Sequence, residues 1–374
     1  MAMMDPKITI NSEENNTLHF TLANIHYSLA NSLRRIALAD VPTVVFRTFP
    51  HNESKVDIIT NTTRLNNEII KQRIGCIPIH ITDTDFPYEE YVIECDKKND
   101  SDTIMLCTTE DLKIKNISTD QYLSASATKE IFPPDSITGD YIPITRLRPK
   151  ISENIEGEHI QFAAKLDLAT AKQDGMYNIV STCAYGNTMD SVKANDIWND
   201  QKIQHQKDGM SEEDIDFEYR NWLLLDAKRI TVPNSFEFTV ESVGVFTNFA
   251  IMYKSCDIMI QKCKAFIDML EKGDIDIKAN ENTTLDNEYI ITLKNEDYTL
   301  GNALTYFLYE KYFIADKTVT FVGFKVPHPH IPDSIIRMAF ESVSSDKTTV
   351  AQYLTDAAQN IITTFTNIQQ NFKP

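Results

Sequence analysis

The sequence predicts an α+β protein that contains one dimerisation-type module twice and carries a strand-rich inserted domain in its first half. Three observations support this prediction: a repeated segment, a long amphipathic helix at the end of each half, and a stretch of the first half without a counterpart in the second. Most homo-oligomers are two-fold dimers. We therefore expect the two modules to pair within the chain as a pseudo-dimer.

The repeated segment occupies residues 21–33 and 292–304, which align without gaps 271 residues apart. Seven of the thirteen positions are identical. The identical pairs are Thr21/Thr292, Leu22/Leu293, Asn24/Asn295, Tyr27/Tyr298, Leu29/Leu300, Asn31/Asn302 and Leu33/Leu304. Self-similarity at a fixed spacing indicates one structural unit that is used twice.

Each copy of the repeat is expected to be a strand, a turn and a helix. Residues 17–22 and 289–293 have patterns typical of strands. Ser28 and Thr299 are candidate N-caps, because a hydroxyl can accept a hydrogen bond from a free amide of the first helical turn. Apolar residues follow at helical spacing. They are Leu29, Leu33 and Ile36 in the first copy and Leu300, Leu304 and Phe307 in the second.

A long amphipathic helix is expected near the end of each half, with apolar residues at alternating steps of three and four. Such stripes are common in the core of a single domain. Their matched positions in the two halves favour pairing of the halves through these helices. With the six residues above, the predicted interface includes Phe249, Tyr253, Ile260, Ile361 and Phe365.

The predicted domain boundaries follow from the repeat. They are 1–83 and 231–271 for the first module, 84–230 for the inserted domain, 272–283 for a polar linker and 284–374 for the second module. Within the insertion, residues 196–220 are acidic and contain Trp198. We expect a solvated surface loop there, with a partner-binding loop as the alternative.

Composition excludes several classes of function. The chain has 374 residues and a formal net charge of −18, which argues against direct binding of nucleic acid because that requires a basic face. No secretory signal and no membrane-spanning stretch is expected, so the chain is expected to be soluble and intracellular. The six cysteines contain no Cys-x-x-Cys pair, so no metal site and no cofactor are expected. Cys76 and His80 are the only close Cys/His couple, and packing explains both.

Four segments resemble a known family. Asn31–Thr43 resembles the signature helix of alpha-like subunits of multisubunit DNA-dependent RNA polymerases, and Gln72–Ile79 resembles that family's second characteristic segment. The first half is similar to the third subunit of RNA polymerase II or its archaeal D-type counterpart. Glu296–Leu304 and Val322–Pro329 are similar to the eleventh subunit or its archaeal L-type counterpart.

The resemblance implies a non-catalytic assembly platform that docks the two large catalytic subunits and is accompanied by small polymerase subunits. It implies no catalytic residue, no direct contact with nucleic acid and no membrane. In the family, the signature helix and its arginines face a large subunit, so Arg34 and Arg35 are expected docking residues, with a favourable cation near a helix C-terminus as the alternative. Arg73, in the second characteristic segment, is the third expected docking residue. The second copy has Thr305 and Tyr306 at the positions of Arg34 and Arg35.

Joining the two subunits in one chain resembles the polymerases of large double-stranded DNA viruses of eukaryotes. The resemblance implies a viral fusion protein that acts in the host cytoplasm or nucleus, and it leaves packaging in the virion open. Two other functions stay open from the residues alone. One is a stand-alone transcription or adaptor factor that reuses the alpha-like fold, and the other is an enzyme in its own right.

Overall fold

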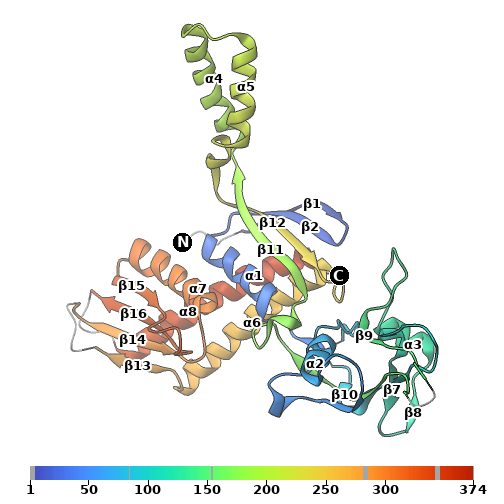
Figure 1. Ribbon diagram of the computed structural model, residues 1–374. Coiled ribbons are helices and arrows are strands. Elements are labelled where there is room, and N and C mark those ends of the chain that lie inside the picture. The colour runs from blue at the N-terminus through green and yellow to red at the C-terminus, as the bar shows by residue number, and fades with distance from the viewer. Residues whose placement is uncertain (1–4, 84, 153–154, 281–284, 342–345, 374) are drawn as a thin grey trace. The chain divides into compact units, whose positions relative to one another are not determined.

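A computed structural model describes residues 5–83, 85–152, 155–280, 285–341 and 346–373. The chain forms two compact units (Figure 1). The first unit comprises Met1–Ala37, Thr182–Glu241 and Asn248–Pro374, and the second comprises Leu38–Ser181 and Ser242–Thr247.

The first half of the repeat builds a four-stranded antiparallel sheet with two helices. The strands, in their order across the sheet, are β1 (Lys7–Glu14), β2 (Thr17–Ala23), β12 (Thr231–Ser242) and β11 (Val180–Met189). The helices are α1 (Tyr27–Ala39) and α6 (Asn248–Lys272). Phe20 on β2 lies opposite Phe238 on β12, and their rings stack with centroids 4.9 Å apart.

The second half repeats this plan. Its strands, in sheet order, are β13 (Asp276–Ala279), β14 (Glu288–Leu293), β16 (Ser334–Phe340) and β15 (Val319–Lys325). Its helices are α7 (Tyr298–Leu308), which runs on into a π-helical segment at Tyr309–Ala315, and α8 (Lys347–Gln369). Strand order and helix placement are the same as in the first half, so the repeat extends well beyond the thirteen aligned residues. The predicted fold class is confirmed.

The turn between strand and helix explains one identity of the repeat. Asn24 and Asn295 have φ values of 59° and 56°. Asparagine enters this left-handed region more readily than other residues with a side chain. The same special turn therefore requires the same residue in both copies.

The predicted N-caps are wrong. Helix α1 begins at Tyr27, and the Ser28 amide donates to His26 Nδ1 at 3.3 Å. Helix α7 begins at Tyr298, and Asp297 Oδ1 accepts from the Thr299 amide at 2.8 Å. Both helices begin one residue before the predicted cap, so the two hydroxyl residues lie inside the helices.

Two insertions, rather than one, distinguish the first half from the second. The residues between α1 and β11 form most of the second unit, and the residues between β11 and β12 form a helical hairpin. The predicted inserted domain, 84–230, therefore does not coincide with either of these two insertions. Strands β3 (Thr43–Phe46) and β4 (Val56–Asn61) lie before residue 84 but pair with β10 (His159–Ala169), which places them in the second unit.

The second unit is a mixed sheet-and-helix domain with its own core. Its main sheet has the order β3-β10-β5-β7-β8, with β4 also paired to β10, and β6 pairs separately with β9. The remaining elements are β5 (Tyr91–Lys98), β6 (Met105–Thr108), β7 (Lys113–Asn116), β8 (Gln121–Tyr122), β9 (Pro143–Leu147), α2 (Asn67–Gly75) and α3 (Ala125–Ile131). Phe46, Phe132 and Phe162 are buried in its core.

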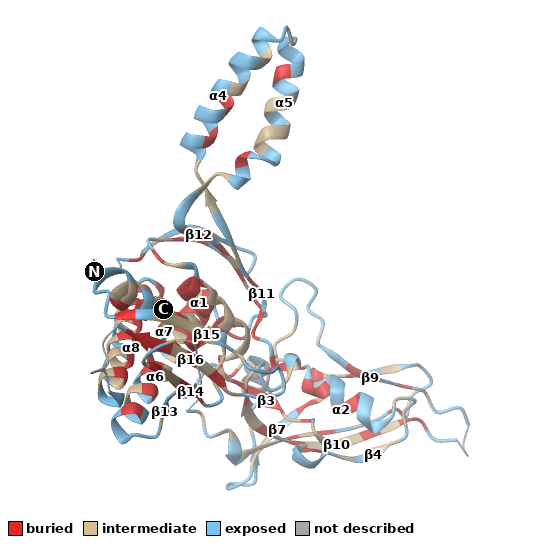
Figure 2. Cartoon of the chain, turned by 90° about the vertical axis from the view of Figure 1, so that its left-hand side faces the viewer, coloured by how far each residue is buried: buried red, intermediate tan, exposed pale blue. Residues whose placement is uncertain are grey.

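The acidic stretch 196–220, which we expected to be a loop, is helical. Helices α4 (Ser191–Lys207) and α5 (Glu212–Leu224) form a hairpin at the end of β11 and β12, and most of its surface is exposed (Figures 1 and 2). Asp190 and Ser211 cap the two helices. Trp198 is buried between them, with its ring centroid 5.1 Å from that of Tyr219. Charged and amide side chains outnumber the apolar ones in these two helices, which weakened the sequence signal.

The expected linker, 272–283, is largely ordered structure. Gly273, with φ 75°, ends α6, and the amide of Asp274 donates to the Met269 carbonyl at 2.9 Å. This is a Schellman-type helix end, in which a left-handed glycine reverses the chain. Strand β13 begins three residues later and pairs with β14. It is the counterpart of β1, not a flexible tether. Residues 281–283 lie outside the described residues.

Leu33 and Leu304 are fully buried at equivalent positions of α1 and α7. Leu33→Asp or Leu304→Asp should destabilise the chain by more than about 3 kcal/mol, because each loses apolar packing and buries an unpaired carboxylate. Thermal or urea unfolding measures this change. Val192→Asp on α4 is the matched control, since Val192 is 69% exposed, and should unfold like wild type. Normal stability of both leucine variants would contradict this packing.

Candidate functional site

The most extensive contact between the two halves is that of α6 with α8, which lie side by side (Figure 1). The faces that they bury are apolar. The fully buried residues include Met252, Cys256, Met259 and Cys263 on α6 and Leu354, Ile361, Phe365 and Ile368 on α8. Phe372, just beyond α8, is buried and lies 5.1 Å from Phe20 of the first half, ring centroid to ring centroid. Each fully buried large apolar side chain contributes about 1.5–3 kcal/mol.

A polar cluster joins α1 to the start of α7. The Ser32 hydroxyl donates to the Thr299 carbonyl at 2.6 Å. Arg35 Nε donates to Thr299 Oγ1 at 2.9 Å, and Arg35 Nη2 forms an ion pair with Asp297 Oδ2 at 2.8 Å. Asp297 also caps α7, so one carboxylate fixes the helix start and binds the other half of the chain. Charged hydrogen bonds of this kind are the stronger ones in proteins.

The pseudo-symmetric positions hold a different contact. His26 and Tyr306 align with Asp297 and Arg35 in the repeat, and their rings stack with centroids 4.0 Å apart and planes 12° apart. Burial lowers the pKa of His26 to about 4, so the imidazole is neutral near pH 7. One end of the interface is therefore an ion pair, and the other end is an aromatic stack.

A second ion pair crosses between the halves farther along α6. Lys262 Nζ lies 3.3 Å from Glu296 Oε1, and both side chains are about three-quarters buried. Glu296 directly precedes the cap residue Asp297. The turn before α7 thus presents two successive carboxylates to two different helices of the first half.

Comparisons with known proteins find a family match for each of the two halves. A family model described as the RNA polymerase Rpb3/Rpb11 dimerisation domain matches residues 19–263, and a second model of the same description matches residues 288–371. The first match covers well over half of the chain. The chain belongs to the Rpb3/Rpb11 dimerisation-domain family. It is an alpha-like RNA polymerase subunit, and both of its dimerisation domains lie in one polypeptide.

The similar curated proteins are subunits of the same class. The chain is 26% identical to the Dictyostelium discoideum DNA-directed RNA polymerases I and III subunit rpac1, over 71% of the chain and 82% of the relative. It is 27% identical to the RNA polymerase II subunit RPB3 of Schizosaccharomyces pombe, over 73% and 91%. It is 22% identical to the RNA polymerase subunit Rpo3 of Methanosphaera stadtmanae, over 71% and 99%. These are non-catalytic components of DNA-directed RNA polymerase.

The structure places the predicted interface residues of this alpha-like subunit on the four expected helices. Nine of them are buried: Leu29, Leu33, Ile36, Ile260, Leu300, Leu304, Phe307, Ile361 and Phe365. Phe249 and Tyr253 are partly buried, and both contact the second half. The Phe249 ring lies 6.0 Å from that of Phe372, and the Tyr253 carbonyl accepts from Gln369 Nε2 at 3.4 Å.

The three expected docking arginines are found in different settings. Arg35 binds the second half of the alpha-like chain through Asp297 and Thr299. Arg34 is partly exposed and donates to Asn31 Oδ1 within its own helix at 2.9 Å. Arg73 lies in the second unit, where Nε and Nη2 donate to the carbonyls of Ile144 and Pro143 at 2.7 and 2.6 Å. The expectation for Arg35 overlooked its intramolecular partner because Asp297 lies 262 residues away in the sequence.

The polar and aromatic contacts at non-identical repeat positions were missing from the predicted interface. His26, Asp297, Thr299 and Tyr306 differ between the copies, whereas the predicted interface consisted of residues from apolar stripes. The signal that could have found them is this difference itself. A residue that must be the same in both copies maintains the module, and a residue that differs is free to bind the other copy.

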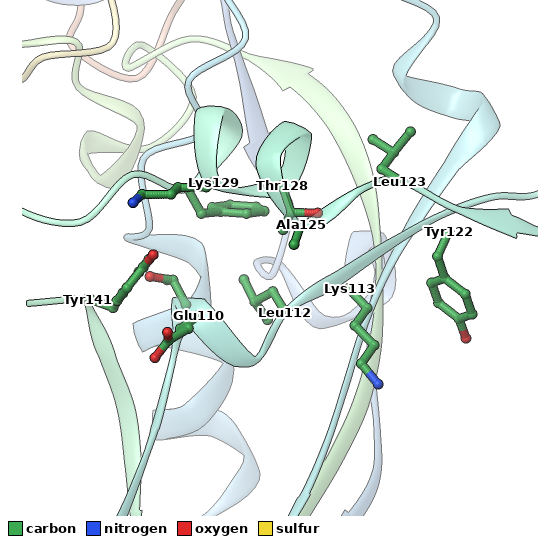
Figure 3. Close-up of a pocket in the computed structure, with 11 residues that line it drawn as sticks. Glu110, Leu112, Lys113, Tyr122, Leu123, Ala125, Thr128, Lys129 and Tyr141 are labelled. Carbon is green, nitrogen blue, oxygen red and sulfur yellow. The ribbon is translucent and has the colours of Figure 1, made fainter.

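The cavity beside α3 offers little catalytic chemistry. One, of about 580 Å³, lies beside α3 in the second unit, with Glu110 and Tyr141 on one side and Lys113 toward the other (Figure 3). The described residues that line it include no histidine, cysteine or serine. Burial raises the pKa of Cys183 and of Cys263 to about 12, which disfavours the reactive thiolate.

Cys76 and His80, the only Cys/His couple that the sequence offered, share no hydrogen bond in the described part of the chain. Burial lowers the pKa of His80. Among the described residues, no group of three or more His, Cys, Asp or Glu side chains is placed to hold a metal ion. No described helix combines the length and apolar character of a membrane span.

The Arg35–Asp297 ion pair should contribute measurably to stability. In a double-mutant cycle with Arg35→Gln and Asp297→Asn, which keeps a cap acceptor, we expect a coupling energy of about 0.5–1 kcal/mol from urea unfolding. The pair Arg220–Asp216 on α5 is a control, since its side chains are 74% and 58% exposed. As an i,i+4 helix pair, it should give a smaller coupling energy, of about 0.3 kcal/mol. Equal coupling in the two cycles would remove the special role of the interface pair.

His26 should make stability depend on pH. The folded state resists protonation until about pH 4, whereas an unfolded histidine takes up a proton near pH 6.5. The contribution of neutral His26 is therefore complete above pH 6.5 and is lost as the pH falls toward 4. We expect the stability advantage of wild type over His26→Asn to shrink between pH 7.5 and pH 5, as measured by urea unfolding. A constant difference would show that His26 does not titrate differently on folding.

Proposed function

We propose that this chain is the assembly platform of a DNA-dependent RNA polymerase and that its two halves form an intramolecular pseudo-dimer which docks the two large catalytic subunits. The single observation that carries the proposal is the pair of dimerisation-domain matches in regions that contact each other through α1, α6, α7 and α8. The module boundaries that we propose differ from the predicted 1–83 with 231–271 and 284–374, because residues 38–83 group with the second unit and β13 (Asp276–Ala279) pairs within the second module.

The contacts support pairing of unlike halves. If two first halves paired in the same way, Arg35 would meet His26 and Ser28 in place of Asp297 and Thr299. If two second halves paired, Tyr306 would meet Asp297 in place of His26. Either like pair loses both the ion pair and the aromatic stack. Specificity of this kind combines favourable contacts in the right pair with unfavourable ones in the wrong pair.

Docking of a large subunit is proposed for the α1 surface around Arg34. This guanidinium is partly exposed, and its described hydrogen bond uses only Nε and stays within α1. Four of its five N–H donors are thus available to a partner. Thr305 occupies the equivalent position in the second half, so the two ends of the platform would present different surfaces to the two large subunits.

The proposed partners are the two large catalytic subunits and the small subunits of the same polymerase. The named relatives favour this function over a stand-alone transcription or adaptor factor, because each is itself a polymerase subunit. We further propose that the chain acts in the cytoplasm or nucleus of a host cell as a viral fusion of two subunits. Mass spectrometry of purified particles tests whether it is packaged in the virion.

The test is co-purification from the native source with mass spectrometry of what stays bound in high salt. We expect two very large subunits at equal stoichiometry with the wild-type chain. Arg34→Glu should reduce their recovery at least fivefold without changing the fold, because the new carboxylate repels the acidic groups that would bind the guanidinium. Arg229→Glu is the control. The Arg229 side chain is 82% exposed and lies in the insertion between β11 and β12, away from α1. This variant should recover both subunits normally.

Recovery of the wild-type chain without large subunits would overturn the platform proposal. Normal recovery by Arg34→Glu would leave the platform in place and move the docking surface away from α1. The two failures are therefore distinguishable in one experiment.

A further inference from the structure

A second cavity, of about 690 Å³, gathers positive charge on a chain whose formal net charge is −18. It lies in the second unit and shares no lining residue with the cavity of Figure 3. Its charged lining residues are Arg64, Arg73, Arg146, Arg148 and Glu158. Four arginines around one cavity of an acidic protein need an explanation, because basic residues that serve only solubility would be spread over the whole surface.

Three of these arginines lie on or directly beside regular elements. Arg73 lies in the last turn of α2, and its Nε and Nη2 donate to the carbonyls of Ile144 and Pro143 on β9. Arg146 lies on β9 opposite Leu106 on β6. Arg64 precedes α2, which Asn66 caps. The guanidinium of Arg73 is thus held at the cavity wall by two hydrogen bonds.

Most of the positive charge has no carboxylate partner among the described residues. Glu158 accepts from the Arg148 amide at 2.8 Å and forms an ion pair with its guanidinium, so these two charges cancel. In the part of the chain that the structure describes, Arg64, Arg73 and Arg146 form no ion pair with a carboxylate. Arg73 uses two of its five N–H donors for backbone carbonyls, which leaves three for a ligand.

One wall of the same cavity is aliphatic. Ile104 is 66% exposed and Leu106 is 46% exposed, although both are large apolar residues. Leu65 and Pro143 continue this wall. An apolar surface next to unpaired guanidinium groups is typical of a protein-binding site, where an apolar contact supplies affinity and the charges supply orientation.

We propose that this cavity binds an acidic segment of a partner protein. In the bound state, carboxylates of the segment pair with Arg64, Arg73 and Arg146. An aliphatic or aromatic side chain between them packs on Ile104 and Leu106. Arginine forms paired hydrogen bonds with carboxylates, which fits such a segment. The site differs from the α1 surface, so the inference does not depend on the docking role proposed for Arg34.

A peptide fits the site better than a nucleic acid does. Nucleic-acid surfaces are extended basic stripes that follow a phosphate backbone, and single strands stack their bases on aromatic side chains. Here the basic residues surround one cavity, and its apolar wall is aliphatic. The overall charge of −18 would also repel a polyanion outside this cavity.

The test measures fluorescence anisotropy with the full chain and three labelled probes of equal length. The probes are a peptide of alternating Glu and Leu, the same peptide with Gln for Glu, and a single-stranded oligoadenylate RNA. We expect the Glu peptide to bind at least tenfold more tightly than the Gln peptide. Arg64→Glu with Arg146→Glu should weaken its binding at least tenfold, and Ile104→Ser with Leu106→Ser should weaken it severalfold.

The matched control is Lys113→Glu with Lys129→Glu, which makes the same change of charge at the cavity of Figure 3. It should bind the Glu peptide like wild type. All altered side chains are exposed or at the cavity wall, and thermal unfolding verifies that each variant folds. Absence of binding, equal binding of the two peptides, or equal weakening by both charge variants would overturn the proposal. Tighter binding of RNA, lost in Arg64→Glu with Arg146→Glu, would overturn it in favour of a nucleic-acid site.

Discussion

The burial of α6 and α8 against each other is the contact on which the rest of the first unit depends. Each helix has a continuous apolar face that its own four-stranded sheet does not fully cover, and each face is buried where the two helices meet. Phe372 extends this contact to Phe20 and Phe249, so the end of the second half completes the core of the first. Neither half is a finished domain without the other, which explains why the polar contacts at α1 and α7 can be selective rather than strong.

The module tolerates large insertions because they enter where its chain turns. The second half connects α7 to β15 and β15 to β16 by short segments, and the first half places a whole domain and a helical hairpin at the equivalent points. Both insertions leave the strand order and the paired helices unchanged. Binding surfaces such as the arginine-lined cavity could therefore be added at these points without rebuilding the part of the molecule that pairs.

The sequence predicted the repeated module well because its periodic patterns are local. Strands β2 and β14 and the long helices lie where their apolar residues indicate. It failed where the deciding contact is distant or the signal is weak. Strands β3 and β4 join a sheet through β10, about a hundred residues onward. Strand β13 has no sequence likeness to β1, and in the α4–α5 hairpin charged and amide side chains outnumber the apolar ones. The partner of Arg35 could not be read from a single helix.

The glycine turn at the end of α6 has a consequence for how copies of this chain interact. Every contact between the two halves could be made equally well between the first half of one molecule and the second half of another, which is the condition for domain swapping. The turn at Gly273 leads into β13 after two residues, and β13 is part of the second sheet. The left-handed turn at Gly273 directs the chain back toward its own first half. Loss of that turn would extend this short connection and favour exchange of second halves between two copies.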